Sequence, residues 1–181
     1  MNYHSNIDYR RNIPGELQKL PNWGVFKLIW QEDRQKYTKH PYNALTGQLA
    51  SSTDSSTWCS FEDAVSVYES SEEYQGLAFF FQKPYIGIDL DGIGEDLDRY
   101  LEGDVTDNII YEFMSACRTY AEVSQSGKGV HLIGKIDDIP GARRRKGNVE
   151  MYNSGRFFAI TGNRFGEFVD EVNWIGSVAK F

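Results

Sequence analysis

The stretch Ile86-Gly87-Ile88-Asp89-Leu90-Asp91-Gly92 carries the strongest structural signal in this sequence of 181 residues. Apolar residues alternate in it with glycine and aspartate, a pattern typical of a β-strand, in which successive side chains point to opposite faces. The apolar side chains would lie on one face, whereas Asp89 and Asp91 would lie together on the other. The two carboxylates would then stand about 7 Å apart along the strand.

Two like charges on one face of an apolar strand repel each other, and two arrangements can accommodate them. A divalent cation would remove the conflict, because Mg²⁺ and Mn²⁺ favour one or two carboxylates together with water and substrate phosphates. Alternatively, Asp89 and Asp91 are simply solvated at the end of the strand. The Asp-x-Asp pattern by itself does not decide between a metal site and a solvated strand end.

Short strands and a few helices surround this stretch. Helical spacing of apolar residues predicts two helices, one capped by Ser60 and one capped by Thr106. Runs of β-branched and aromatic residues predict strands at 23–30, 76–81, 85–91, 120–124, 130–136, 148–152 and 156–161, and loops at 39–42 and 92–104. Tight turns would join 120–136 and 148–161 into two hairpins. The pattern predicts an α+β domain with a largely antiparallel sheet and a few packed helices.

The composition is that of a folded, soluble protein with an acidic balance. Hydrophobic residues make up 40% and aromatic residues 14% of the chain, which excludes a disordered chain. No apolar run could span a bilayer and the N-terminus lacks a signal-peptide pattern, which favours the cytoplasm. Cys59 and Cys117 have no metal-binding spacing, which excludes a zinc knuckle and a disulfide scaffold. The net charge of −7 argues against simple electrostatic adhesion to DNA or RNA.

A second motif, Ser124-Gln125-Ser126-Gly127-Lys128-Gly129-Val130-His131, combines glycines, a lysine and a histidine at a predicted turn. Glycines let backbone N–H groups approach an anion, and Lys128 adds positive charge. His131, on the strand that leaves the turn, could donate a hydrogen bond to a phosphate. The spacing is not that of a Walker A motif. The alternative is an ordinary glycine turn followed by a histidine with a structural partner.

Glu150 interrupts the otherwise apolar stretch Val149-Glu150-Met151-Tyr152. A carboxylate at such a position needs a cationic partner, either a metal or an arginine. Arg156, on the predicted return strand, could supply a cross-strand ion pair. Glu150 is therefore either a metal ligand or one half of a structural ion pair.

Taken in order, these three motifs resemble those of the archaeo-eukaryotic primase superfamily. They are similar in particular to the bifunctional DNA primase/polymerase (prim-pol) domain at the N-terminus of phage and plasmid replication proteins. The family motifs would be Asp89 with Asp91, then Ser126 with His131, then Glu150, which stands where relatives frequently carry aspartate.

The resemblance extends beyond the three motifs. Residues 36–42 resemble the basic segment that prim-pol domains carry upstream, and Trp58 lies in the stretch that follows it. Residues 156–162 are similar to the closing strand of these domains. The resemblance therefore spans most of the chain, roughly from Leu20 to Asn163.

The resemblance implies an RRM-like primase core over residues 20–165, a flexible N-terminal segment over 1–19 and a C-terminal extension over 166–181. It implies metal-dependent, template-directed nucleotidyl transfer with Mg²⁺ or Mn²⁺ as the cofactor. The implied catalytic residues are Asp89, Asp91, Glu150 and His131, of which the three acids would hold the metal. The implied nucleotide-binding residues are Ser126, Gly127, Lys128, Gly129, His131, Arg156 and Lys39.

The run Arg143-Arg144-Arg145-Lys146 is the one dense basic block of the chain. It is either a solvated face or a clamp for template and primer phosphates, and the acidic remainder of the chain favours the clamp. The implied partners are a single-stranded DNA template and primer, a dNTP or NTP, and a helicase domain or protein, with no membrane. The expected setting is phage, plasmid or mobile-element replication in the cytoplasm of a bacterial host cell.

Two other functions remain open from the residues alone. A nuclease could use the same acids with His131 to cut a phosphodiester with two metals. A truncated or repurposed prim-pol domain could instead bind a basic partner protein through its acidic surface.

Overall fold

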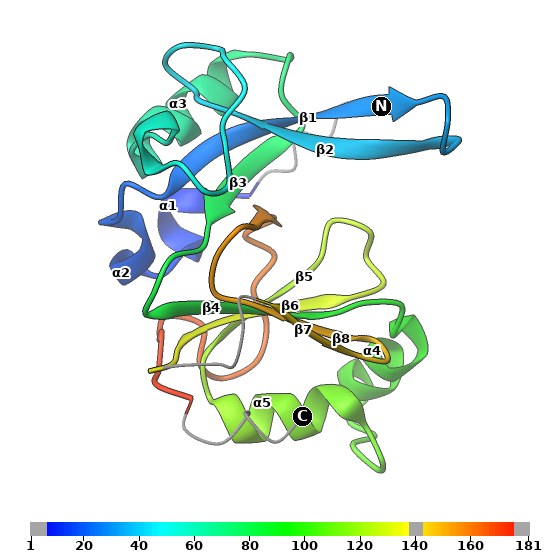
Figure 1. The fold of residues 1–181 in the computed structure, drawn as a ribbon. Helices are drawn as coiled ribbons and strands as arrows, with labels where there is room; N and C mark the ends of the chain where they lie inside the picture. Colours follow the sequence, from blue (N-terminus) through cyan, green and yellow to red (C-terminus); the bar gives the residue numbers. More distant parts are fainter. Residues whose placement is uncertain (1–6, 138–142, 176–181) are drawn as a thin grey trace.

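Two antiparallel sheets form the framework of the computed structural model, which describes residues 7–137 and 143–175 (Figure 1). Sheet A has the strand order β2-β1-β3-β9, and sheet B has the order β5-β6-β4-β8-β7. The strands of sheet A are β1 (Trp23–Gln31), β2 (Lys36–Tyr42), β3 (Gly76–Phe80) and β9 (Phe157–Ile160). Those of sheet B are β4 (Tyr85–Leu90), β5 (Tyr120–Val123), β6 (Val130–Lys135), β7 (Arg143–Lys146) and β8 (Val149–Tyr152). The predicted α+β class with antiparallel pairing is confirmed.

The helices are short, and several of them begin at polar caps. They are α1 (Tyr9–Asn12), α2 (Gly15–Gln18), α3 (Phe61–Ser70), α4 (Gly94–Leu101) and α5 (Ile109–Cys117), with a 3₁₀ turn η1 (Ser55–Thr57). The predicted cap of α3 is confirmed, because Ser60 Oγ accepts the N–H of Asp63 at 3.2 Å. The predicted cap of α5 is wrong: Asn108 Oδ1, rather than Thr106, accepts the first free N–H groups, at 3.0 and 3.2 Å. Helix α4 also replaces part of the loop expected at 92–104.

One face of sheet B packs against α4 and α5, which lie on the side of that sheet away from sheet A (Figure 1). Ile86, Ile88 and Leu90 of β4 are fully buried in this cluster, as their alternation predicted. Their burial removes the apolar face of β4 from water and leaves Asp89 on the other face. The strand therefore presents its acids toward sheet A.

A second, more aromatic core joins the two sheets and helices α1, α2 and α3. Phe81, after β3, meets Phe158 of β9 edge-to-face, with ring centroids 4.7 Å apart. Both rings press on Gly87 of β4, where a Cβ atom would lie 2.4 Å from the Phe81 ring and 2.7 Å from the Phe158 ring. Gly87 thus lets the aromatic core approach the strand that carries Asp89. On the outer face of sheet A, Trp58 stacks on Phe80 at 5.0 Å.

The hairpin predicted over 148–161 is wrong. Strand β8 pairs with β4 and β7 in sheet B, whereas β9 pairs with β3 in sheet A. The turn signal at 153–155 is local, but burial of Phe158 and Ile160 in the aromatic core draws β9 to the other sheet. The loop predicted at 39–42 is also wrong, because these residues belong to β2 and pair with β1.

The two ends of the described chain pack onto the fold. Residues 9–18 form α1 and α2 and bury Tyr9, Ile13 and Leu17, so the predicted flexible segment 1–19 is wrong for this part; residues 1–6 lie outside the described residues. Within the predicted extension 166–181, Val172 and Ile175 are buried, and residues 176–181 lie outside the described part. None of the helices in the described part has the length and apolar character needed to cross a membrane.

Candidate active site

A row of ionisable side chains crosses the face of sheet B that is turned away from α4 and α5. The register pairs Asp89 with His131 on one side and with Glu150 on the other. It also pairs His131 with Glu122 and Glu150 with Arg145. Residues directly opposite each other in antiparallel strands share a face, so these five side chains form one row from β5 to β7. Asp89 lies at its centre.

Asp89 belongs to β4 and Asp91 follows its last residue, and the two side chains differ in exposure. Asp89 is half-buried, and burial raises the pKa of its carboxyl group. The charge of His131 acts against this increase, whereas the neighbouring carboxylates of Asp91 and Glu150 add to it. Asp91 is exposed, and its Oδ1 accepts the N–H of Gly92 at 2.9 Å. Asp91 and Glu150 are thus close enough to disfavour the charged form of Asp89.

The carboxylates fit a cation that brings some of its own ligands. Among residues 7–137 and 143–175, no three His, Cys, Asp or Glu side chains are arranged as a ready-made metal site. Mg²⁺, however, is usually bound by one or two carboxylates together with water and substrate phosphates. Asp89 and Asp91 supply that donor set, and Glu150 stands beside Asp89. A cation would also relieve the burial and repulsion that raise the pKa of Asp89.

A cavity of about 230 Å³ opens over Asp89 and collects residues from both sheets. It is lined by Lys39, Asp89, His131, Tyr152, Arg156, Phe157, Phe158 and Ala159. Lys39 comes from β2, and its Nζ lies 5.9 Å from the centroid of the Phe26 ring. Loss of hydration among the surrounding side chains lowers the pKa of Lys39. The negative charges of Asp89, Asp91 and Glu122 oppose that decrease. Two cationic side chains and a carboxylate therefore share one cavity, a combination suited to phosphate and a metal.

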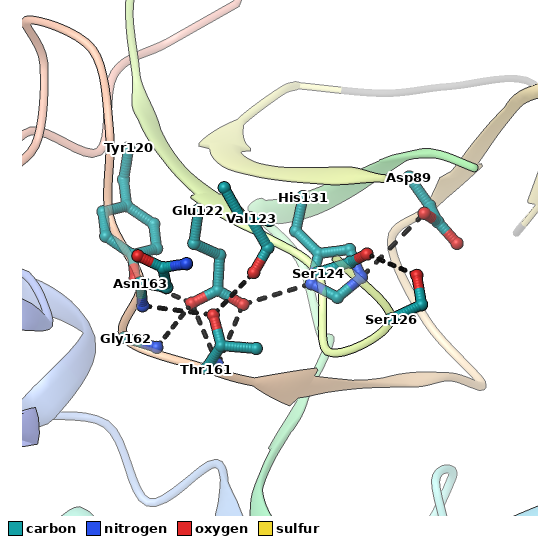
Figure 2. A network of polar contacts seen from close by, with 10 residues as sticks. All are labelled: Asp89, Tyr120, Glu122, Val123, Ser124, Ser126, His131, Thr161, Gly162 and Asn163. Carbon is teal, nitrogen blue, oxygen red and sulfur yellow. Dashed lines mark hydrogen bonds and ion pairs between the residues drawn. The ribbon is translucent and has the colours of Figure 1, made fainter. Parts of the chain in front are cut away.

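The ring of His131 is held on three sides, and Figure 2 shows two of its neighbours, Glu122 and Asp89. Its Nδ1 lies 3.1 Å from Glu122 Oε1, and its Nε2 lies 3.9 Å from Asp89 Oδ1. Its face stacks on Phe158, with ring centroids 4.3 Å apart. Because a carboxylate only accepts hydrogen bonds, Nδ1 donates to Glu122, and Nε2 faces the Asp89 side of the cavity. His131 can therefore keep Glu122 as a structural partner at Nδ1 while Nε2 takes a functional role.

Glu122 is the site residue that the sequence analysis missed. It is fully buried, and its carboxylate also accepts the Tyr120 hydroxyl at 2.8 Å and the N–H groups of Thr161 and Gly162 at 3.1 and 3.0 Å. These two N–H groups directly follow β9 of sheet A, so Glu122 ties the His131 strand to the other sheet (Figure 2). The signal was available: extending the predicted 120–136 hairpin by its register places Glu122 opposite His131.

The glycine turn between β5 and β6 packs against the end of β4. Ser124 N–H donates to the Gly129 carbonyl oxygen at 2.9 Å, and the side chains of Ser126 and Lys128 are exposed. At Gly129 a Cβ atom would lie 2.6 Å from the carbonyl oxygen of Leu90 and 3.5 Å from the Cα atom of Asp91. Glycine at 129 therefore brings the turn next to the Asp-x-Asp end of β4. Gly127, at φ +71°, provides the left-handed turn conformation.

The basic block forms strand β7 at the edge of sheet B. Arg145 Nη1 lies 3.1 Å from Glu150 Oε1, and Lys146 is exposed. The side chains of Arg143 and Arg144 lie outside the described part of the structure. Arg145 of the neighbouring strand is thus an ion-pair partner of Glu150, and the Arg156 guanidinium lies 5.4 Å from the centroid of the Tyr152 ring.

Comparison with known proteins identifies a phage relative of this chain. No protein-family model matches the chain. The chain is 32% identical over 156 residues to a DNA primase-polymerase of Nitratiruptor phage NrS-1. The alignment covers 82% of this chain and 20% of the phage protein, so the chain spans about a fifth of the length of that relative.

The similarity covers most of the present chain, and the ordered motifs that resemble those of prim-pol domains meet on one face of sheet B. The α+β fold with two antiparallel sheets is consistent with a primase-like core. Over most of its length this chain is therefore similar to part of a phage DNA primase-polymerase.

Proposed function

We propose that this domain catalyses metal-dependent, template-directed nucleotidyl transfer, as a DNA primase or polymerase. The observation that carries the proposal is the placement of Asp89 between His131 and Glu150 on the wall of a cavity that also contains Lys39 and Arg156. The similarity to a phage DNA primase-polymerase supports the same reaction class. We further propose that the reaction serves phage, plasmid or mobile-element replication together with a helicase.

In this reaction a 3′-hydroxyl oxygen attacks the α-phosphorus of a nucleotide, the new O–P bond forms, and the bond to pyrophosphate breaks. Catalysis then depends on positioning and on charge stabilisation. Asp89 and Asp91, with Glu150, would hold Mg²⁺ or Mn²⁺, which would neutralise phosphate charge and favour loss of the hydroxyl proton.

The remaining residues of the cavity bind and orient the nucleotide. Lys39 and Arg156 offset the negative charge of the triphosphate. His131 presents Nε2 toward the reacting phosphate, because its Nδ1 is engaged by Glu122. The turn at 126–129 places Lys128 beside the end of β4, where its ammonium group can contact a phosphate.

The test is primer extension and priming on single-stranded DNA with dNTPs or NTPs and with Mg²⁺ or Mn²⁺. The key variant is Asp89→Asn with Asp91→Asn, which removes charge while keeping side-chain shape. Asp98→Asn, an exposed acid on α4, is the matched control. We expect template-dependent synthesis by the wild type and by the control, and its loss in the double variant.

Two results would contradict the proposal. A wild-type protein that neither binds nucleotides nor extends a primer with any metal would favour the partner-binding function. Degradation of DNA without nucleotides, abolished in the Asp89→Asn and Asp91→Asn variant, would assign the site to a nuclease.

A further inference from the structure

Two large aromatic side chains stand exposed at the end of the β1–β2 ribbon. The pairing of β1 with β3 ends at Phe26, and β1 continues with β2 alone as a two-stranded ribbon that projects beyond β3 (Figure 1). Trp30 and Tyr37 are directly opposite each other on this ribbon, with ring centroids 5.1 Å apart. Trp30 is 40% exposed and Tyr37 is 62% exposed, so the contact between the rings leaves much of their surface in water.

The aromatic pair lies on the face of the ribbon that carries Lys39. Lys39 is two residues from Tyr37 on β2 and opposite Leu28 on β1, so the period of two puts all of these side chains on one face. Lys39 lines the cavity over Asp89. The aromatic pair therefore continues the wall of the candidate active site, about 7 Å further along the strand.

The surroundings of the pair suit a single nucleic-acid strand. Proteins that bind single strands combine aromatic side chains, on which bases stack, with cations that follow the backbone. At the ribbon end, Arg34 pairs with Asp33 at 3.6 Å and Gln35 donates to the Glu32 carbonyl oxygen at 2.8 Å, and Lys36 is exposed next to Tyr37. Lys39 thus stands beside Tyr37 on the same face of the ribbon, whereas the side chain of Lys36 points to the opposite face.

We propose that Trp30 and Tyr37 form a stacking platform for a base of the single-stranded DNA template. This inference rests on the proposed function. The cavity of Asp89, His131 and Lys39 would take the phosphates of the reacting nucleotide, whereas the platform lies outside that cavity and is open to water. A strand can therefore cross the platform and continue beyond it, and this favours the template over the incoming nucleotide.

The test measures the affinity of the full chain for a labelled single-stranded oligonucleotide by fluorescence anisotropy, without nucleotides. We expect Trp30→Ala and Tyr37→Ala each to weaken binding about tenfold, the order expected when one base no longer stacks on an aromatic ring. Trp30→Phe, which keeps an aromatic face, should retain most of the affinity. Trp174→Ala is the matched control, because Trp174 is 56% exposed and lies beside Lys135 at the far end of β6.

Further measurements separate stacking from other effects. Because no charge is removed, the slope of affinity against salt should stay the same in every variant. The dNTP affinity should also stay the same, and the circular dichroism spectrum should remain that of the wild type.

Unchanged DNA affinity in a natively folded Trp30→Ala, Tyr37→Ala double variant would overturn the inference. So would an equal decrease in Trp174→Ala, or a decrease in dNTP affinity with normal DNA affinity. If the wild type extends primers and the double variant binds template normally, only the platform fails. If the wild type neither extends primers nor binds nucleotides, the proposed function fails.

Discussion

Replacing Glu122 by alanine would remove the acceptor that joins the two sheets behind His131. Four groups donate to this carboxylate: the Tyr120 hydroxyl, His131 Nδ1 and the N–H groups of Thr161 and Gly162. Glu122 itself is fully buried, and His131 is 6% exposed. The change would therefore leave several donors without a partner in a region that water reaches poorly.

The size of the effect follows from this set of donors. A buried polar group left without its hydrogen bond costs about 1–3 kcal/mol, and removing one partner from a buried charged network costs about 3–5 kcal/mol in total. Because domains are typically stable by only about 5–15 kcal/mol, Glu122→Ala should lower the free energy of unfolding by a large fraction. Tyr120→Phe removes one donor and leaves the carboxylate in place, so it should cost only about 1 kcal/mol.

The assay is urea unfolding of the wild type, Glu122→Ala, Glu122→Gln and Tyr120→Phe, followed by circular dichroism. Glu122→Gln should be milder than Glu122→Ala, because its amide oxygen still accepts N–H groups. It should nevertheless change the imidazole ¹⁵N shifts of His131, since the amide does not reproduce the carboxylate at Nδ1. Tyr120→Phe should leave those shifts nearly unchanged.

A decrease in unfolding free energy below about 1 kcal/mol in Glu122→Ala would refute this reasoning, since that is the net value of a single hydrogen bond. Unaltered His131 shifts in Glu122→Gln would refute the link to the histidine. The nucleotide affinity adds a third readout. If Glu122 acts through His131, adding Glu122→Gln to His131→Ala should weaken binding no further.

Three other predictions address the core, the thiols and the basic block. Gly87→Ala should destabilise the protein by about 1–3 kcal/mol in urea unfolding, because its Cβ would overlap the rings of Phe81 and Phe158. Gly15→Ala, where no heavy atom lies within 4 Å of the new Cβ, should be nearly neutral, and equal effects of the two changes would contradict this account. Burial raises the pKa of the Cys117 thiol to about 12 and also raises the pKa of Cys59, so neither should react readily with a thiol reagent at pH 8 until the protein is unfolded. Rapid modification of the native protein would show that the burial is incorrect. Alanine at Arg143, Arg144, Arg145 and Lys146 together should lower the salt slope of single-stranded DNA binding by about 0.7 for each phosphate that these side chains neutralise, and an unchanged slope would exclude the clamp.

Local patterns in the sequence were sufficient for much of the fold. The alternation in 86–91 correctly predicted a strand with a buried apolar face and an acidic face. The helical spacing after Ser60 correctly predicted the buried side of α3. These features depend on near neighbours along the chain, and their signals lie within a few residues.

The pairing of distant strands was harder to predict from the sequence. The turn at 153–155 favoured a hairpin, but β9 pairs with β3 of sheet A, where Phe158 and Ile160 are buried in the aromatic core. Similarly, Thr106 was a reasonable cap by residue type, yet Asn108 fills the role because its side-chain amide also donates to the Asp96 carbonyl oxygen at 2.7 Å. Where the local sequence allows two strand pairings or two helix caps, contacts between residues far apart in sequence decide which one forms.

The candidate site divides in the same way. The sequence by itself determined the Asp89–Asp91 face, the glycine turn with His131 and the acidic position of Glu150, because each depends on strand alternation or on a short motif. Only the tertiary structure decided that His131 and Glu150 flank Asp89, that Lys39 and Arg156 reach the same cavity, and that the Glu122 carboxylate is buried between the two sheets. These relations depend on the register of strands from distant parts of the chain and on burial of a charge between two sheets, which no local pattern encodes.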